Sequence, residues 1–510
     1  MVTTKVLTCA FNGIDVIPVT VEVQIMSGLP KFVIVGLADK AVSEARERIT
    51  SAFHSIGTSL PAKRIIVNLA PADLEKVGTH YDLPIAVGIM SALDFIKQED
   101  LNDYLVMGEL GLDGKIAGVS GVLPSSMFAV NNNKGIICPE VCKDEVFWSG
   151  NRDVLAIDNL LQLVNHFKGT QIIVSDPTLN DNSGNLIDKL RNTKSSVDFS
   201  EVKGQTIAKR ALEIAAAGGH NVLFIGPPGV GKSMLAERFH TILPPMSSGE
   251  IIEVSTIHSV AGILGKKSIQ LERPFRSPHH TASTVALSGG GPHAYPGEVS
   301  LAHKGVLFLD ELPEFGSQAL EVLRQPLETG KITIARAANH VTYPADFQLI
   351  AAMNPCKCGH FGNPSLSCSS APLCAIKYQN KISGPIYDRI DIFVYLKPTP
   401  PWQLKSIADG EKSEVILDRV LNARNFLNNR QQNVINKSLS GKLFDKIMEN
   451  ITPEASKLLI NSAEKMHISS RGYNKILKVA RTIADLDTSD NIEVRHIAEA
   501  LSYRKQDIKV

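Results

Sequence analysis

Residues 221–233 run Asn-Val-Leu-Phe-Ile-Gly-Pro-Pro-Gly-Val-Gly-Lys-Ser, which is a short apolar strand followed by the pattern G-x4-G-K-[ST]. A segment with helical character, Met234 to His240, comes next. Strand, glycine-rich loop and helix in this order are the context of a phosphate-binding loop. Glycines let backbone N–H groups converge on phosphate oxygens, and the helix N-terminus adds partial positive charge. The alternative is a glycine-rich turn without a ligand.

The pattern also gives each loop residue a role. Lys232 would reach the β- and γ-phosphates of ATP, and the Ser233 hydroxyl would ligate Mg²⁺. The predicted cofactor-binding residues are Gly226, Pro227, Pro228, Gly229, Val230, Gly231, Lys232 and Ser233, together with Asp310.

An acidic pair ends a second apolar strand. Val306-Leu-Phe-Leu309 runs into Asp310 and Glu311. Two carboxylates at the end of a buried strand are costly unless a cation or a substrate uses them. In a phosphate-loop enzyme Asp310 would hold Mg²⁺, with Ser233, and Glu311 would act as general base on the attacking water. A strand that runs into a helix capped by Asp310 is the alternative.

Composition places the chain among ordinary globular proteins. Its 510 residues are 44% hydrophobic and 21% charged, and this length indicates roughly three domains. A net charge of +1 excludes a globally basic coat for nucleic acid, although a local basic stripe stays open. There is no apolar run of membrane-spanning length, no secretory pattern at the N-terminus, and an odd count of seven cysteines. We therefore expect a cytoplasmic protein without a membrane partner.

The strand and helix patterns divide the chain into four parts. The expected parts are a mixed α/β domain at 1–165, a linker at 166–197, a nucleotide-binding domain with a parallel sheet at 198–400, and a helical segment at 401–510. Within the first part we expect strands at 31–36 and 64–69, helices at 41–56 and 83–93, and a hairpin at 105–119.

The two phosphate-site motifs, followed by an apolar strand from Phe347 to Asn354, resemble those of the AAA+ ATPases. More closely, the chain resembles the Mg-chelatase-like ComM/YifB family over nearly its whole length. The segments that carry the resemblance are Gly36-Leu-Ala-Asp39, Asn68-Leu-Ala-Pro-Ala-Asp73, Asp82-Leu-Pro84, Arg273-Pro-Phe-Arg-Ser-Pro-His-His-Thr281, Asp310-Glu-Leu-Pro-Glu-Phe315, Ala352-Met-Asn-Pro-Cys356 and Ser383-Gly-Pro-Ile-Tyr-Asp-Arg-Ile-Asp391.

This resemblance implies an α/β fold. A three-layer AAA+ P-loop module with a helical lid would follow a Lon-protease-like α+β domain of the ribosomal S5 type. It also implies an ATP- and Mg²⁺-dependent homo-oligomeric ring, with six subunits expected. Competence-related members of the family act as branch-migration motors in recombination during transformation, so branched or single-stranded DNA is the expected partner.

The resemblance assigns three more catalytic residues beside Glu311. Asn354 would orient the attacking water as sensor 1. Arg471, in Ser-Ser-Arg-Gly-Tyr473, matches the sensor 2 arginine and would contact the nucleotide from the lid; a surface arginine at a helix start is the alternative. Arg389 matches an arginine finger that would act in the neighbouring subunit's site, and an intrachain ion pair with Asp388 or Asp391 is its alternative.

The Lon-like domain is not expected to be a peptidase. The region comparable to the protease's nucleophile stretch is Lys76-Val-Gly-Thr-His-Tyr-Asp-Leu-Pro84, which contains no serine. Thr79 would have to substitute, and no base is evident in the sequence. We expect a scaffold or a binding domain for a protein client.

Four cysteines, Cys356, Cys358, Cys368 and Cys374, fall within nineteen residues. Four thiolates suit a structural tetrahedral Zn²⁺, and His360 is a substitute ligand. Free thiols in a loop are the alternative, because C-x-C is tighter than the usual C-x2-C spacing. His279 and His280 are adjacent, but they have no acidic or cysteine partner at a recognisable spacing.

Two stretches are candidates for contact with DNA. The first is a predicted hairpin at 330–336 and 340–343, whose basic residues are Lys331, Arg336 and His340. The second is the loop 287–293, with Lys266, Lys267 and Arg273 upstream. A solvated basic face is the alternative for both.

Three functions compete at this stage: a DNA motor, a chelatase-type or protein-remodelling ATPase, and a regulatory ATPase that needs no DNA. The phosphate-site motifs fit all three, and only the resemblance favours the first.

Overall fold

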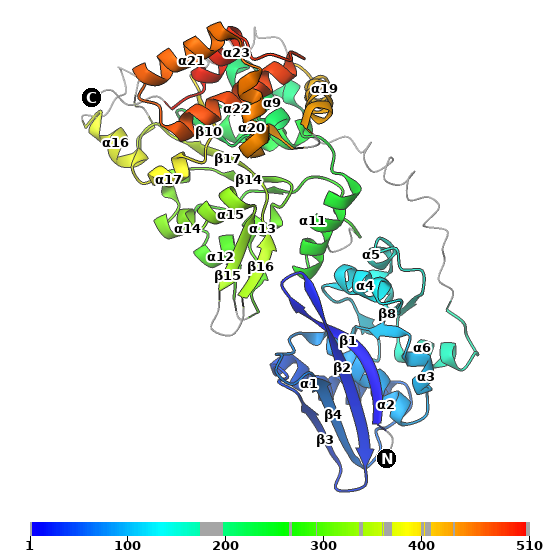
Figure 1. Cartoon of the computed structure of the whole chain (residues 1–510). Coiled ribbons are helices and arrows are strands. Elements are labelled where there is room, and N and C mark those ends of the chain that lie inside the picture. The colour runs from blue at the N-terminus through cyan, green and yellow to red at the C-terminus, as the bar shows by residue number, and fades with distance from the viewer. Residues whose placement is uncertain are drawn as a thin grey trace.

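Two β-sheets organise the chain in the computed structural model (Figure 1). The structure describes residues 3–173, 197–264, 268–291, 293–335, 340–359, 361, 370–398, 402, 410–431 and 434–505. Most of the predicted linker therefore lies outside the described residues.

The N-terminal sheet has seven strands in the order β3-β4-β2-β1-β5-β8-β9. Its centre is the antiparallel pair of β1 and β2, and the other strands add in parallel except for β4, which pairs antiparallel with β2. The strands are β1 (Thr3–Asn12), β2 (Asp15–Met26), β3 (Lys31–Val35), β4 (Arg64–Ala70), β5 (Tyr104–Val106), β8 (Gly135–Pro139) and β9 (Val154–Ile157).

Helices cover this sheet where the sequence shows apolar residues at helical spacing. The nearly all-apolar stretch predicted as a buried helix forms α2, in which Asp82 to Ser91 are all buried. The helices are α1 (Lys40–Ser55), α2 (Asp82–Ala92), α3 (Gln98–Leu101), α4 (Val122–Asn131), α5 (Lys143–Phe147) and α6 (Leu160–Phe167), with 3₁₀ turns at Thr79–Tyr81 and Glu140–Cys142.

The expected hairpin at 105–119 is shorter than predicted. Only β6 (Glu109–Leu110) and β7 (Ile116–Ala117) pair as a hairpin, around the turn at Asp113-Gly114. The residues before them form β5 instead, in which Leu105 pairs with Leu7 of β1 and Val106 with Ile137 of β8. An apolar strand is buried on both faces there, which the end of a hairpin would not provide.

The second sheet consists of five parallel strands in the order β11-β14-β17-β10-β18. The strands are β10 (Val222–Ile225), β11 (Phe275–Arg276), β14 (Val306–Leu309), β17 (Gln348–Met353) and β18 (Ile392–Tyr395). Alternate residues of β10, such as Phe224 and Leu223, belong to two different apolar cores on the two faces. Burial on both faces explains why these strands are continuous apolar runs in the sequence.

Helices on both faces give this domain its layers (Figure 1). On one face α9 packs against the C-terminal helices α19 and α22. The helices are α9 (Thr206–Gly218), α10 (Lys232–Phe239), α11 (Ser248–Val260), α12 (Thr284–Ser288), α13 (Glu298–Leu301), α14 (Ser317–Glu321), α15 (Arg324–Thr329), α16 (Leu373–Gln379), α17 (Gly384–Tyr387), α19 (Ser413–Gln431), α20 (Gly441–Glu449), α21 (Pro453–Lys465), α22 (Ser470–Leu486) and α23 (Val494–Ser502).

Two small hairpins extend from the other face. They are β12 (Gly289–Gly290) with β13 (Tyr295–Pro296), and β15 (Lys331–Ala335) with β16 (His340–Pro344). The second confirms the hairpin predicted between the Asp310 and Asn354 strands. Among the described residues, no helix is both long and apolar enough to cross a membrane.

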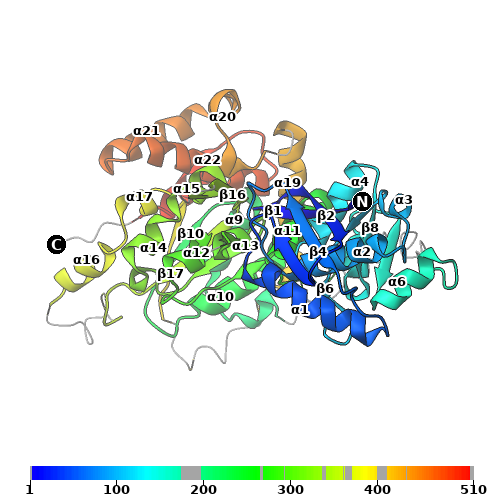
Figure 2. The same ribbon diagram turned by 90° about the horizontal axis from the view of Figure 1, so that it is seen from below.

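Among the described residues, the N-terminal domain meets the domain predicted to bind nucleotide around α11 and around β16 (Figures 1 and 2). Helix α11 packs on α4, where Ser259 donates a hydrogen bond to the Glu145 carboxylate and its carbonyl accepts one from Gly121 N–H at 3.0 Å. The β1–β2 turn touches β16 so closely that a Cβ on Gly13 would lie 2.8 Å from Val341.

Candidate nucleotide-binding site

The glycine-rich loop connects the end of β10 to the start of α10. Gly229 and Gly231 have φ angles of +78° and +91°, a backbone region that L side chains rarely adopt. Lys232 is the first residue of α10, so the helix N-terminus is directed at the loop. The structure therefore places the predicted loop where backbone amides and a helix dipole favour an anion.

Lys232 links this loop to the strand predicted as sensor 1. Its Nζ donates to the carbonyls of Gly226 at 2.7 Å and Pro227 at 3.0 Å, and to Asn354 Oδ1 at 3.0 Å. Burial lowers the pKa of Lys232, and the nearby carboxylates of Asp310 and Glu311 act in the opposite direction. A buried ammonium held only by neutral oxygens is poised to exchange them for phosphate.

Ser233 makes the second link, to the acidic strand. Its hydroxyl donates to Asp310 Oδ2 at 2.7 Å. The strand β17 lies between β14 and β10, so Asn354 at its end stands between the acidic pair and the phosphate loop. Three carboxyl ends of adjacent parallel strands thus converge on one place, which is the usual position of a ligand in such sheets.

The donor set at this point fits Mg²⁺. Ser233 and Asp310 supply a hydroxyl and a carboxylate oxygen, the hard ligands that Mg²⁺ prefers alongside phosphate oxygens. The same pair would hold the metal of a bound Mg-ATP, as the sequence predicts.

Glu311 has an unusual backbone. Its φ is +52°, in the left-handed region that few non-glycine residues adopt, and its side chain is half exposed. His280 Nδ1 lies 3.4 Å from Glu311 Oε2. The sequence does not predict this contact of His280, because the proximity of the two segments has no local signal.

Arg389 and Arg471 share a different cavity, of about 320 Å³, and none of the described phosphate-loop residues lines it. Arg389 donates to Glu328 at 2.5 Å and to the Pro385 carbonyl at 2.8 Å, and its Nε is buried without a partner among the described residues. Arg471 is 67% exposed, 3.9 Å from Asp388. Within this chain Arg471 therefore lies beside Arg389. It does not lie at the phosphate loop, where a sensor 2 arginine is expected to contact the nucleotide.

A buried polar network fixes the backbone beside the cavity of Arg389 and Arg471, which we call the arginine face. The sequence does not predict this network. Asp391 accepts a hydrogen bond from Asn221 N–H at 3.0 Å and pairs with Lys475 of α22 at 3.3 Å. Asn221 Nδ2 also donates to the Arg389 carbonyl at 2.8 Å, and Asn221 Oδ1 accepts from Lys437 at 3.0 Å. Nearby cations, Lys475 first, lower the pKa of the buried Asp391 carboxyl in spite of its desolvation.

Two cysteines of the cluster, Cys356 and Cys358, lie close to the phosphate loop. Cys356 Sγ is 3.0 Å from Cys358 Sγ, and a Cβ on Gly359 would lie 2.8 Å from the Pro228 ring. Burial and the neighbouring Cys358 raise the pKa of Cys356. Cys368 and His360 lie outside the described residues, and the described ones contain no group of three metal-ligating side chains.

The structure describes only some of the residues that are predicted to contact DNA. Lys331 and His340 are exposed near opposite ends of the β15–β16 ladder, whereas Arg336, Lys266 and Lys267 lie outside the described residues. Arg273 is not free for DNA in this structure, because its guanidinium donates to the carbonyls of Pro244 and Lys304, both at 2.6 Å.

The N-terminal nucleophile candidate is also occupied. The Thr79 hydroxyl donates to the Glu109 carboxylate, and Lys76 is fully buried with its Nζ bound to the carbonyls of Pro71 and Leu74. These contacts use the polar groups of the region in structural hydrogen bonds.

Comparison with known sequences gives three matches to families that are described as subunit ChlI of magnesium chelatase. They cover residues 198–404, 21–141 and, for the C-terminal part of that subunit, 410–504. The chain is 41% identical over 501 residues to the uncharacterized protein YifB of Escherichia coli K12, covering 98% of this chain and 96% of YifB. It is 40% identical over 497 residues to the competence protein ComM of Haemophilus influenzae, covering 97% of this chain and 96% of ComM. It is also similar, at 28% identity over 163 residues, to the magnesium-chelatase 67 kDa subunit of Chlorobaculum parvum, covering 31% of this chain and 23% of that subunit.

Proposed function

Because the chain belongs to the Mg-chelatase-like AAA+ family that includes YifB and ComM, we propose that it is a Mg²⁺-dependent ATPase that moves branched DNA. The observation that carries the ATPase proposal is the pair of contacts around the phosphate loop. Lys232 reaches Asn354 at 3.0 Å and Ser233 reaches Asp310 at 2.7 Å, so residues from three adjacent strand ends meet at one anion site.

The residues at this site have separate tasks in hydrolysis. Lys232 leaves its carbonyl partners and neutralises charge on the β- and γ-phosphates. Asn354 and Glu311 orient the attacking water, and the Glu311 carboxylate accepts its proton as the bond to the γ-phosphate forms and the ADP oxygen leaves. Asp310 and Ser233 would hold the Mg²⁺, which would supply positive charge to the phosphates.

Arg389 and Arg471 support an assembly of several chains. Both lie in a cavity separate from their own phosphate loop, so we assign them to the nucleotide of a neighbouring subunit in a homo-oligomeric ring, with six subunits expected. Arg389 must exchange Glu328 for a phosphate to act as an arginine finger. Mixing Arg389→Ala protein with Lys232→Ala protein should restore a fraction of active sites; no recovery, with subunit exchange shown separately, contradicts the assignment.

The cargo proposal depends on similarity and on the hairpin β15–β16. The relative ComM is named a competence protein, which supports a role in recombination during natural transformation. Lys331 and His340 are exposed on the hairpin and would contact phosphates. Affinity for branched DNA should therefore fall as salt rises from about 50 to 200 mM, because each neutralised phosphate adds to the slope.

The decisive experiment uses Glu311→Gln, which keeps the shape of the general base and removes its charge. With Mg-ATP, this variant should bind nucleotide, hydrolyse it at least about 100-fold more slowly, and accumulate as a ring on branched DNA. The matched control is Glu321→Gln, an exposed glutamate on α14 outside the site. ATPase stimulation of the unaltered chain separates the rivals: branched DNA favours the motor, a protein client bound by the N-terminal domain favours a remodelling ATPase, and neither favours a regulatory one.

We also propose a structural Zn²⁺ held by Cys356, Cys358, Cys368 and Cys374. The support is that two of these sulfurs already lie 3.0 Å apart beside the phosphate loop. Metal analysis of protein purified without chelators should give about one zinc per chain. A value well below one removes the proposal without affecting the ATPase assignment.

A further inference from the structure

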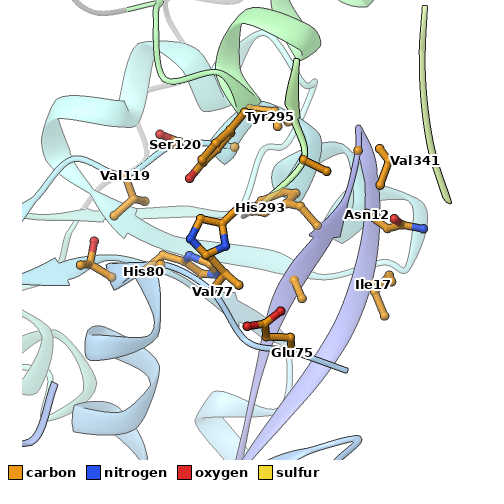
Figure 3. A pocket seen from close by; sticks show the side chains of 18 of the residues that line it. Asn12, Ile17, Glu75, Val77, His80, Val119, Ser120, His293, Tyr295 and Val341 are labelled. Atoms are coloured by element: carbon orange, nitrogen blue, oxygen red, sulfur yellow. The ribbon is translucent and has the colours of Figure 1, made fainter. Parts of the chain in front are cut away.

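A cavity of about 380 Å³ lies where the N-terminal domain meets the nucleotide-binding domain. Figure 3 shows side chains from both domains around it. Glu75, Val77 and His80 come from the segment before α2, whereas His293, Tyr295 and Val341 come from the two hairpins of the nucleotide-binding domain. Its volume is within the range of small-ligand sites, about 300 to 1,000 Å³.

The charge of the wall is negative. Glu75 and Glu109 line the cavity, and the described residues of its wall include no lysine or arginine. The Arg48 guanidinium does not line the cavity; it makes two hydrogen bonds to Asp82, at 2.6 and 2.9 Å, and is attracted through space to Glu109 as well. Two carboxylates around one cation leave one negative charge uncompensated. The Lys76 ammonium beside Glu75 is bound to backbone carbonyls and gives the cavity no positive group.

A buried histidine adds an acceptor. His80 is 6% exposed, and burial lowers its pKa to about 4, so the ring is neutral at pH 7. Its Nε2–H donates to the Cys9 carbonyl at 2.9 Å, because a carbonyl can only accept. In this tautomer Nδ1 carries a lone pair, and no hydrogen bond to it occurs among the described residues. The charged groups of the wall accept hydrogen bonds only, whereas Asn12, Ser120 and Tyr295 donate as well as accept, so a cation that donates matches this wall better than an anion.

Aromatic rings complete the wall. Phe11 and His80 meet edge to face with centroids 5.8 Å apart, and His293 and Tyr295 do the same at 5.9 Å. The faces of such rings attract cations, and a charged ligand gains most where water is partly excluded. Carboxylates, a bare imidazole nitrogen and aromatic faces are together the recognition chemistry of an organic cation.

We propose that this interdomain cavity binds an organic cation, an ammonium or guanidinium group on a short carbon chain. The group would lie between Glu75 and Glu109 and donate to His80 Nδ1, with its carbon chain against Tyr295 and Val77. Because the wall includes β16, whose hairpin joins α15 to the Asn354 strand, the ligand bridges the N-terminal domain and the ATPase domain. This inference is independent of the DNA-motor proposal.

The test is isothermal titration of the nucleotide-free full chain with 1,5-diaminopentane and with agmatine. The neutral and anionic probes of matched length are 1,5-pentanediol and glutarate. We expect saturable binding of one cation per chain, weaker at high salt, and no binding of the neutral or anionic probe. Binding of a blocked Gly-Lys-Gly peptide more tightly than the diamine identifies a protein's basic side chain as the ligand, and the reverse order identifies a free amine; both outcomes support the site.

Two variants test whether the cation binds at the two glutamates of the cavity. Glu75→Gln and Glu109→Gln should each weaken it about tenfold or more, because each removes a charge-assisted hydrogen bond. Glu47→Gln, at an exposed position on α1, should leave it unchanged. The proposal is overturned if no cation binds by 10 mM, roughly the limit of a usable site, if pentanediol or glutarate binds as well, or if both Gln variants bind like the unaltered chain. Mg-ATP affinity, measured on the same variants, shows that they are folded.

Discussion

Replacing Asp391 with asparagine is expected to destabilise the nucleotide-binding domain by about 3 kcal/mol. Asp391 is 8% exposed and lies directly before β18; its carboxylate contacts Asn221 N–H, directly before β10, at 3.0 Å and Lys475 of α22 at 3.3 Å. Asparagine keeps the shape and removes the charge. Lys475 then loses its ion-pair partner at 3.3 Å, and Lys437 loses one of the two carboxylates that attract it, the other being Asp346.

The magnitude follows from these contacts. Removing one partner of a buried ion pair costs about 3 to 5 kcal/mol, since the other charge stays desolvated. We take the lower end, because Lys475 also donates to the Ile390 carbonyl at 2.8 Å and keeps that hydrogen bond. For a domain of about 300 residues the entropy of unfolding is roughly 0.6 kcal/mol per kelvin, so Tm should fall by about 5 °C.

Differential scanning calorimetry at pH 7 measures this shift, and the chain provides a matched control. Asp388→Asn changes the same residue type three positions earlier, where the carboxyl is 55% exposed and 3.9 Å from Arg471. We expect that change to cost less than about 0.5 kcal/mol. The double variant Asp391→Asn/Lys475→Met should recover about 1 kcal/mol or more, since it also removes the orphaned charge.

The dependence on pH gives a second check. The pKa of Asp391 is lowered in the folded chain, so its stabilisation is present above the unfolded value of about 3.9 and is lost as the pH falls through the folded value. The Asp391→Asn variant has no carboxyl at this position to protonate, so it does not lose this stabilisation at acid pH. The reasoning is refuted if Asp391→Asn costs under about 1 kcal/mol, if Asp388→Asn costs as much, or if the double variant is additive.

Three further changes have definite outcomes. Lys232→Ala should weaken Mg-ATP binding about 10- to 150-fold in a titration, because charge-assisted hydrogen bonds contribute about 1.5 to 3 kcal/mol. Gly121→Ala should lower the Tm of the N-terminal domain more than Gly150→Ala. Both glycines have φ near +79°, but only at position 121 would the new Cβ lie 2.3 Å from the Phe11 ring, a clash that adds about 1 to 3 kcal/mol to the loss of stability. Equal Tm shifts in the two variants count against the packing argument. Glu145→Gln should flatten the pH profile of thermal stability. Burial raises the pKa of Glu145, so the unaltered chain loses stability relative to the variant as pH rises above about 4.3. Identical pH profiles of the two proteins would contradict this.

The sequence predicted the parts of the fold that are written in local patterns. The strands β10, β14 and β17 are buried apolar runs. Asp310 and Asn354 directly follow β14 and β17, and the glycine-rich loop that leads to Ser233 follows β10, so the sequence alone predicts these residues as site residues. Their meeting point follows from strand order: β17 lies between the other two. The carboxyl ends of parallel strands lie at the same edge of a sheet, so residues that follow different strands meet in one site although they are far apart in sequence.

Contacts without a local signature were not predictable. Asn221 and Asp391 look like ordinary strand-flanking residues, and their pairing with Lys437 and Lys475 depends on how the C-terminal helices pack on the sheet. The position of Arg471 next to Arg389 depends on the same packing. The interdomain cavity is harder still, because its wall is assembled from segments of two domains that share no pattern in the sequence.

The buried network also indicates how nucleotide state would reach the arginine face. Asn221 is the residue before β10, and the phosphate loop begins at Gly226, directly after that strand. Through its side chain Asn221 holds the Arg389 carbonyl, and through its backbone N–H it holds Asp391, which in turn pairs with Lys475 one turn after Arg471. A shift of β10 on phosphate binding would therefore move both arginines together, because buried hydrogen bonds and an ion pair resist being stretched separately. If the chain forms the homo-oligomer proposed above, Asn221→Ala, which removes the side-chain part of this link, should leave Mg-ATP affinity within about threefold while lowering the cooperativity of hydrolysis between subunits. Asn474→Ala, which changes another asparagine of the same cavity wall, is the control. Equal loss of cooperativity in the two variants would mean that the coupling runs through the cavity surface and not through Asn221.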